Sequence, residues 1–158
     1  MSETTTLKVG GAEVTVETSA LFRAWLEKHL GQHIQPSFAI QAARPGERYA
    51  GSIIEPSGRM RHTFLLPGDE KVPDWNAGMA WAKDCGGDLP DRVEQAMLNA
   101  YLSDEFKPEA YWSNTQHAGY SYNAWYQHFD DGYHYYYYRK SAELRVRAVR
   151  RVFSDSVI

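Results

Sequence analysis

The N-terminal part of the chain has two patterns of apolar and polar residues. Leu7 to Val16 alternates in places between the two kinds, which predicts a strand or a hairpin arm interrupted at Gly10-Gly11. From Leu21 to Leu30 apolar residues recur at helical spacing, and Gly31 follows where a C-terminal glycine belongs. We expect the apolar stripe of this helix to pack on its own domain. Its alternative use is to join neighbouring subunits in a homo-oligomer.

The next segment is interrupted by prolines and predicts short strands. The three candidates are 37–41, 49–55 and 60–66. The sequence Pro56-Ser57-Gly58 separates the last two and is typical of a turn. We therefore expect the second and third strands to be joined directly.

Two helices are predicted after these strands. Asp74 is suited to cap the first helix, whose predicted inner face carries Trp75, Gly78, Met79 and Ala82, and Gly86-Gly87 ends it. Asp91 and Glu94 have the spacing of a capping box, which predicts that a second helix starts there. Its expected buried face consists of Val93, Ala96, Met97, Ala100 and Tyr101.

The C-terminal third changes to a period of two, which predicts strands. The segments 123–130 and 133–140 flank Asp131-Gly132, a dipeptide that suits a tight hairpin turn. A final strand is predicted from Glu143 to Phe153. We expect its apolar residues to point inward and its basic residues outward: Leu144, Val146 and Ala148 against Arg145 and Arg147.

This order of elements predicts an α+β fold with two helices packed beside a small antiparallel sheet, preceded by an N-terminal strand and helix. The expected organisation is an N-terminal extension over 1–34, a main domain over 35–153 and a tail over 154–158. A chain of 158 residues with 43% hydrophobic and 23% charged residues fits one soluble globular domain.

Tyrosine is concentrated in the predicted hairpin region. Nine of the eleven tyrosines lie between Tyr111 and Tyr138. A two-residue loop would pair Asp130 with Tyr133, so that one face collects Tyr126, His128, Asp130, Tyr133, Tyr135 and Tyr137. The other face collects Trp125, Gln127, Phe129, His134, Tyr136 and Tyr138. We assign this second face to the core, because it contains Trp and Phe, and the first face to solvent.

A solvent-facing tyrosine cluster indicates recognition of a ligand. Tyrosine combines a stiff contact area with a hydroxyl at small entropic cost, and exposed aromatic patches tend to mark interaction sites. The alternative is that cross-strand aromatic pairs only stabilise the sheet. We expect a non-enzymatic module that binds a macromolecule, a protein or a glycan, through eight residues: Tyr120, Tyr122, Tyr126, His128, Asp130, Tyr133, Tyr135 and Tyr137.

Four motifs in the second half of the chain resemble the Lcl-type C-terminal domain family. They are Gly-Gly-Asp-Leu-Pro-Asp-Arg-Val-Glu-Gln over 86–95, Tyr-Trp-Ser-Asn over 111–114, Ala-Trp-Tyr-Gln over 124–127, and Arg-Val-Arg-Ala-Val-Arg-Arg over 145–151. Asp91 stands where the family pattern has threonine, and both residues can cap a helix. The resemblance covers about 75–152.

This resemblance implies a C-type-lectin-like fold, of a kind that occurs in adhesins and phage proteins. It makes Leu89, Trp112, Trp125 and the strand around Val146 scaffold residues. Variable proteins of diversity-generating retroelements have a similar fold, and 120–138 resembles their variable region, although a fixed surface of similar composition is equally compatible. The expected ligand is then host-derived, and the expected setting is a virion or the host cytoplasm.

Catalytic and metal sites are not expected from the residues present. Cys85 is the only cysteine, which excludes an internal disulfide and the paired cysteines of formylglycine-generating enzymes, and we expect it to be buried on a helix. His117, His128 and His134 lack the spacing of a close ligand pair, and no nucleotide-binding or nucleophile motif is present. We therefore expect no cofactor and no metal. An enzyme would require a pair of convergent titratable groups.

Charge and hydropathy narrow the possible partners further. The net charge of -3 gives no overall attraction to nucleic acid, and no apolar run approaches the length of a membrane helix. The polar start predicts cytoplasmic synthesis. Two alternatives stay open: inhibition of a host enzyme or defence complex, and single-stranded nucleic acid binding by a basic end next to the tyrosines. We favour a solvated strand for that end, which carries Arg139, Lys140, Arg145, Arg147, Arg150 and Arg151.

Overall fold

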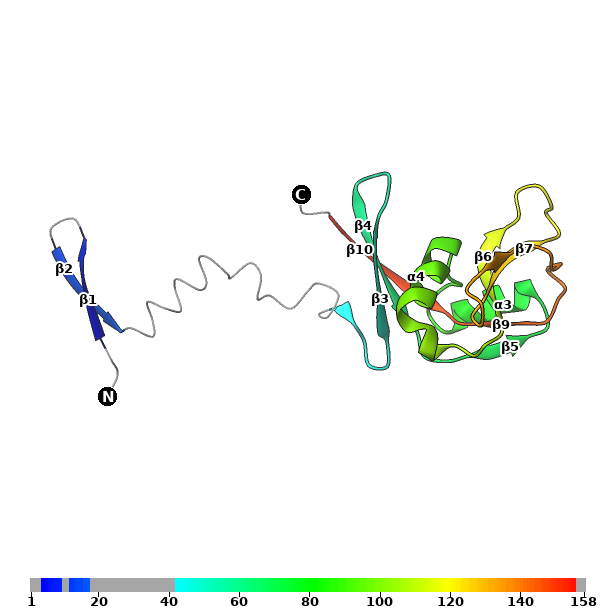
Figure 1. Cartoon of the computed structure of the whole chain (residues 1–158), viewed down its shortest axis with the longest axis horizontal. Coiled ribbons are helices and arrows are strands. Elements are labelled where there is room, and N and C mark those ends of the chain that lie inside the picture. Colours follow the sequence, from blue (N-terminus) through cyan, green and yellow to red (C-terminus); the bar gives the residue numbers. More distant parts are fainter. Residues whose placement is uncertain (1–3, 10–11, 18–41, 156–158) are drawn as a thin grey trace. The chain divides into compact units, whose positions relative to one another are not determined.

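A computed structural model describes residues 4–9, 12–17 and 42–155 of the chain. The chain divides into two compact units, Met1–Phe38 and Ala39–Ile158. In the first unit β1 (Thr4–Val9) and β2 (Ala12–Glu17) pair antiparallel (Figure 1), where the sequence predicted a strand or one hairpin arm interrupted at Gly10-Gly11. The predicted helix at 21–30, the strand at 37–41 and the boundary at residue 34 lie outside the described residues.

The second unit contains a three-stranded antiparallel sheet in the order β10-β4-β3. β3 (Arg48–Ile54) and β4 (Arg59–Leu65) are joined by the predicted turn at Pro56-Ser57-Gly58, where Gly58 has a φ of 83°. β10 (Val149–Asp155) pairs along the other side of β4. In the described part of the chain β3 is therefore an edge strand.

A five-stranded sheet in the order β5-β9-β6-β7-β8 forms the rest of the framework. Its strands are β5 (Glu70–Val72), β6 (Ala110–Gln116), β7 (Ala124–His128), β8 (His134–Tyr135) and β9 (Leu144–Val146). The predicted α+β class is confirmed. The expectation of a purely antiparallel sheet is wrong, because β6 and β9 pair in parallel.

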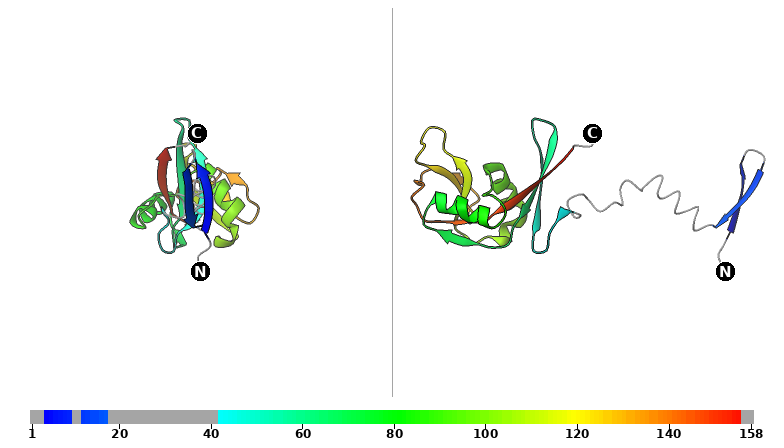
Figure 2. Two further views of the ribbon diagram at one scale, coloured as in Figure 1. Left: turned by 90° about the vertical axis from the view of Figure 1, so that its left-hand side faces the viewer. Right: turned by 180° about the vertical axis from the view of Figure 1, so that it is seen from behind.

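The predicted single strand 143–153 is two strands that belong to different sheets. β9 ends at Val146 and β10 begins at Val149, and the chain between them passes from one sheet to the other (Figures 1 and 2). The amide of Leu66 donates to the carbonyl oxygen of Ala148 at this crossing, over 2.9 Å. This hydrogen bond pairs the Ala148 carbonyl group at the point where the chain passes from one sheet to the other.

The inward placement of Leu144, Val146 and Ala148 is confirmed, but the outward placement of Arg145 and Arg147 is wrong. Both arginines are buried because the protein supplies acceptors for their guanidinium groups. Nε of Arg145 lies 2.8 Å from Oδ1 of Asp69, and Nη2 of Arg147 donates to the carbonyl oxygen of Leu66 over 3.1 Å. A charged side chain with such partners can be buried at the edge of a core.

Helix α3 (Trp75–Asp84) is formed as predicted. The carboxylate of Asp74 accepts from the amide of Ala77 over 2.8 Å and so caps the first turn. Gly78 and Ala82 are buried, and Trp75 and Met79 pack partly buried against the same cluster. Cys85 follows at the end of the helix and is exposed, so the expectation of a buried cysteine is wrong.

Helix α4 (Arg92–Leu102) starts at the predicted capping box, with both reciprocal hydrogen bonds at 2.8 Å. Its predicted inner face is wrong. The buried residues are Glu94, Gln95, Leu98 and Leu102, whereas Val93 is 58% exposed and Tyr101 is 74% exposed.

Internal partners explain why the polar side of α4 is buried. The carboxylate of Glu94 lies 2.6 Å from Nη2 of Arg151 and accepts from Oγ1 of Thr63 over 3.0 Å. Nε2 of Gln95 donates to the carbonyl oxygen of Tyr111 over 2.9 Å. These bonds compensate for the loss of hydration.

The two helices cover the five-stranded sheet from different sides. One apolar cluster joins α3 to Trp112 and Tyr126 of the sheet. The other joins α4 to Leu65 and Val149 of the three-stranded sheet and to Phe106 and Phe129. Because neighbouring residues of a strand point to opposite faces, β7 has no face that is wholly open to solvent.

Candidate ligand-binding surface

The tyrosine-rich hairpin has a different register from the one predicted. Tyr126 pairs with Tyr135 and Gln127 with His134, and the amide of His128 donates to the carbonyl oxygen of Tyr133 over 3.0 Å. The two-residue loop is therefore wrong, and four residues, 129–132, lie between the hydrogen-bonded residues His128 and Tyr133. The register differs from the prediction by two residues, so side chains predicted to lie on the same face of the hairpin still do so.

Side-chain hydrogen bonds stabilise the wider loop. The carboxylate of Asp131 accepts from the amide of Tyr133 and from the hydroxyl of Tyr135, both over 2.8 Å. These bonds, first the one from the Tyr133 amide, hold the pKa of Asp131 below its usual value. Gln127 donates to the carbonyl oxygen of Gly132 over 2.9 Å, and Gly132 has a φ of 77°. The predicted two-residue turn at Asp131-Gly132 did not include these hydrogen bonds to the Asp131 carboxylate.

The predicted strand 133–140 is much shorter than expected. β8 ends at Tyr135. The segment pairs again only at Arg139, which forms an isolated bridge with Asn123, the residue before β7. Tyr136, Tyr137 and Tyr138 therefore leave the ladder. This irregular segment lets the consecutive rings of Tyr136 and Tyr137 contact each other, with centroids 4.9 Å apart.

Most of the predicted binding residues are accessible to solvent. Tyr120, Tyr122, Tyr133 and Tyr137 are exposed, with exposed fractions from 49% to 67%, and Asp130 is exposed as well. His128 and Tyr135 are half-buried. The placement of these side chains at or near the surface agrees with the expectation.

Tyr126 is the exception, because it is 3% exposed and belongs to the core. Its ring meets that of Trp112 edge-on, with centroids 5.8 Å apart, in the cluster beneath α3. Burial raises its pKa to about 12. The prediction assumed a single buried face for this hairpin, whereas α3 and α4 cover one face each. Tyr126 therefore supports the surface from below and does not form part of it.

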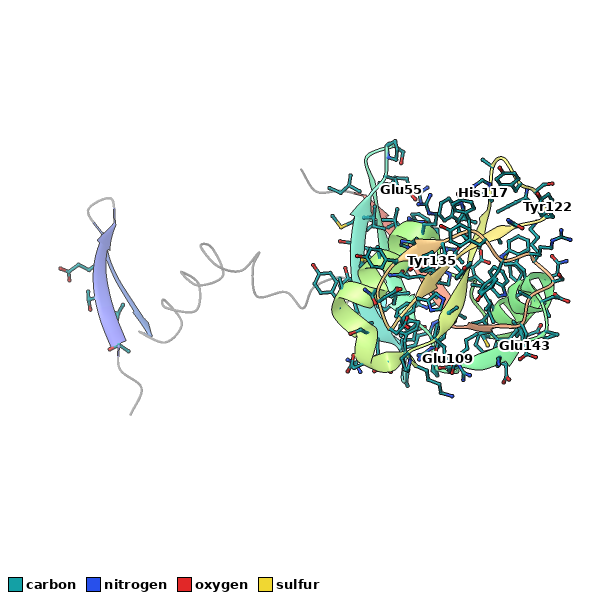
Figure 3. All side chains as sticks on the ribbon, turned by 45° about the vertical axis from the view of Figure 1, so that its right-hand side comes forward. Glu55, Glu109, His117, Tyr122, Tyr135 and Glu143 are labelled. Carbon is teal, nitrogen blue, oxygen red and sulfur yellow. The ribbon has the colours of Figure 1, made fainter. Side chains whose placement is uncertain are left out.

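The rings around β8 form a continuous network that we call the aromatic belt. The belt runs from Tyr122 to Tyr120 (6.0 Å between centroids), to His117 (5.1 Å) and to Tyr136 (4.5 Å). From Tyr136 it continues through Tyr137 (4.9 Å) and Tyr135 (5.9 Å) to Tyr133 (6.5 Å). His117 and Tyr122 lie near the loop that joins β6 and β7, and Tyr135 lies nearer the middle of the hairpin (Figure 3).

His117 is a residue of this surface that the sequence did not single out as a contact. Its ring also lies 5.5 Å from that of Trp125, and its Nδ1 accepts from the amides of Gly119 and Tyr120 over 3.1 and 3.0 Å. It therefore holds the loop that carries Tyr120 and Tyr122. The only signal in the sequence was its place just before a Gly-Tyr turn, which is weak. Tyr138, assigned to the core, is 43% exposed and stacks on Tyr126 at 4.7 Å.

Charges of opposite sign lie at the two ends of the belt. At one end the guanidinium of Arg139 lies 5.5 Å from the ring of Tyr122. Beside the middle of the belt, the guanidinium of Arg92 lies 3.7 Å from the ring of Trp125, which contacts His117 and Tyr136. At the other end Nδ1 of His128 lies 3.2 Å from Oδ1 of Asp130. A polar ligand would therefore find both hydrogen-bond acceptors and cations beside the rings.

The basic C-terminal end is mostly engaged within the protein. Arg150 lies 2.5 Å from the carboxylate of Glu47 and Arg151 lies 2.6 Å from that of Glu94. With the buried Arg145 and Arg147, four arginines of this end have internal acceptors. Lys140 has one as well, because its Nζ donates to Oε1 of Gln116 over 2.5 Å. The expectation of a solvated strand is therefore wrong for the four arginines, and they are poorly placed to contact phosphates.

No group of three His, Cys, Asp or Glu side chains with the geometry of a metal site occurs in residues 4–9, 12–17 and 42–155. In the same residues, no helix is both long and apolar enough to cross a membrane. Comparison of the chain with protein-family models, curated proteins and solved structures found no match.

Proposed function

We propose that the protein is a non-enzymatic binding module that recognises a protein or a glycan through the aromatic belt. The observation that carries the proposal is the exposure of Tyr120, Tyr122, Tyr133 and Tyr137 on a network of rings in mutual contact. Exposed tyrosines that are already held in place lose little entropy when a ligand covers them.

The way in which the belt is anchored supports this proposal. Tyr135 is fixed by its hydrogen bond to Asp131, and Tyr136 contacts both His117 and Trp125. Tyr126 and Trp112 form the buried support. Removal of the four exposed rings should therefore leave the scaffold folded, which is the arrangement that a recognition surface needs.

The C-type-lectin-like and phage-related assignments form part of this proposal. They rest on the motif resemblance and on the agreement between the scaffold role of two motif residues and their burial, since Trp112 and Val146 are fully buried. In a diversified module of this kind, the exposed positions 120, 122, 133 and 137 would vary. A reverse transcriptase encoded nearby, with an adenine-rich repeat of the region coding for residues 120–151, would support diversification.

The experiment compares the wild type with a variant in which Tyr120, Tyr122, Tyr133 and Tyr137 are all replaced by alanine. Labelled protein is applied to a panel of immobilised glycans and a panel of bacterial surface proteins, and hits are measured again in solution as affinity per site. We expect a loss of about tenfold or more for a genuine ligand, because buried tyrosines dominate interfaces of this kind. The fold is checked by near-ultraviolet circular dichroism and thermal melting.

Tyr101→Ala is the matched control, since Tyr101 is 74% exposed but lies on α4 outside the belt. It should leave the affinity per site unchanged. Equal binding by the wild type and the quadruple variant, with both folded, would contradict the proposal. Loss of the fold in the quadruple variant would also contradict it, because it would show that the rings serve the core.

A further inference from the structure

Helix α4 presents an apolar stripe to the outside of the second unit. Val93, Ala96, Met97, Ala100 and Tyr101 recur at the spacing of one helix face, opposite the buried Glu94, Gln95, Leu98 and Leu102. Met97 is partly buried and the other four are exposed. The buried side of α4 is half polar, whereas the side towards solvent is an apolar stripe, and an exposed apolar stripe has the features of an interaction surface.

A shallow groove of about 460 Å³ continues this stripe towards β3. Residues 49–52 form one wall, and Met97, Tyr101 and Leu102 form the other. The backbone bulges between Tyr49 and Gly51, where Gly51 has a φ of 142° and a side-chain Cβ would lie 2.5 Å from Sδ of Met97. The absence of a side chain at position 51 therefore allows Met97 to lie against the strand, and α4 lies beside β3 (Figure 1).

We infer that this face of α4 is the contact between two copies of the chain, paired antiparallel across a two-fold axis. The inference goes beyond the proposed ligand-binding function and does not depend on it. Its physical basis is self-complementarity, which a symmetric interface requires because the same patch meets itself.

The charges at the two ends of the stripe favour a second copy in this orientation. Arg92 lies at the N-terminal end and Asp104 just beyond the C-terminal end, and both are exposed. An antiparallel pair centred at the level of Leu98 sets Arg92 of each copy opposite Asp104 of the second copy. A parallel pair would set like charges together, and the antiparallel helix dipoles add to the preference.

The residues between these charges suit close packing. Ala96 comes opposite Ala100 of the second copy, and two small residues allow the helices to approach closely. In this arrangement Val93 of one copy lies next to the groove of the second copy, close to the Tyr101 that lines that groove. The guanidinium of Arg92 lies over the ring of Trp125, 3.7 Å from its centroid, and a planar guanidinium beside an aromatic ring can still donate to a carboxylate.

Sedimentation equilibrium of the full chain at several concentrations tests this inference. We expect a monomer–dimer equilibrium for the wild type. Ala100→Glu should raise the dimer dissociation constant about tenfold or more, because it places a bulky, unpaired carboxylate against Ala96 of the second copy where the helices approach most closely. Asp104→Arg should weaken the dimer by setting it against Arg92, and the double variant Arg92→Asp/Asp104→Arg should recover most of the loss.

Tyr122→Glu is the control on the aromatic belt and should leave the dissociation constant unchanged. Circular dichroism melting at low concentration verifies that each variant is folded. A wild type that stays monomeric at every concentration overturns the inference. A dimer that is insensitive to Ala100→Glu, or equally sensitive to Tyr122→Glu, overturns it as well, because the contact would then lie elsewhere.

Discussion

Helices α3 and α4 follow each other in the chain, carry similar apolar stripes and start at aspartate caps, yet α3 buries its stripe while α4 turns its stripe outward and buries a half-polar face. α3 places Gly78 and Ala82 against the core. α4 places Glu94 and Gln95 there and leaves Val93 and Tyr101 exposed. The difference lies in the surroundings, because Arg151 and the Tyr111 carbonyl group meet the polar side of α4.

The comparison shows what an amphipathic pattern does and does not determine. A stripe of apolar residues indicates the inner face only when the opposite face has no partners inside the protein. Glu94 serves three groups at once, the amide of Asp91, the hydroxyl of Thr63 and the guanidinium of Arg151. The two distant partners, Thr63 and Arg151, thus outweigh the local hydrophobic preference.

Glu94→Ala should have the largest effect on stability. It leaves Arg151 without its main carboxylate partner in a buried position and removes half of the capping box, so we expect a loss of about 3 to 5 kcal/mol in the free energy of unfolding. Chemical denaturation at neutral pH measures this loss. A loss below about 1 kcal/mol would mean that water reaches Arg151, and the contrast between the two helices would then be much weaker.

Gly78→Ala in α3 should have an intermediate effect. Alanine is normally the better helix residue, but a Cβ at this position would lie 2.8 Å from Cγ1 of Val146. We expect the overpacking to outweigh helix propensity and to cost about 1 to 3 kcal/mol in thermal or chemical unfolding. Ala80→Gly, at an exposed position of α3, should cost only about 1 kcal/mol through helix propensity. Stabilisation by Gly78→Ala would refute the tight contact between α3 and β9.

Val93→Ala combined with Tyr101→Ala should have the smallest effect. Both side chains lie on the exposed side of α4, so at concentrations where the chain is monomeric the free energy of unfolding should change by no more than about 0.5 kcal/mol. The same pair of substitutions should lower the melting temperature only at concentrations where the wild type dimerises. A large loss at low concentration would show that the stripe is packed within the monomer.

Local signals in the sequence predicted much of the fold. Both helix starts, the turn at 56–58 and the presence of a hairpin around Gly132 follow from capping and turn residues that act within a few positions. The crossing at Arg147-Ala148 and the parallel pairing of β6 with β9 depend on contacts far away in the chain. The motif Arg-Val-Arg-Ala-Val-Arg has an unbroken strand pattern, and nothing in it marks the change of sheet.

The candidate site was predicted in outline. Tyr120, Tyr122, Tyr133 and Tyr137 are exposed as expected. Within the hairpin, a two-residue error in register keeps each paired side chain on its face. Tyr126 was misplaced because the alternation of β7 does not reveal that both of its faces are covered. His117 was missed as a contact because its role depends on rings that reach it from Trp125 and Tyr136.

The segment from Leu144 to Asp155 contributes strands to both sheets of the second unit, so we expect the two sheets to unfold together. Loss of β10 from β4 would release the carboxylate of Glu94 from Arg151 and, through the short link at Ala148, loosen β9 between β5 and β6. Amide hydrogens of β4 and β6 should accordingly exchange with solvent through the same rare unfolding event. The sheet that supports the aromatic belt should then be as stable to unfolding as the whole second unit.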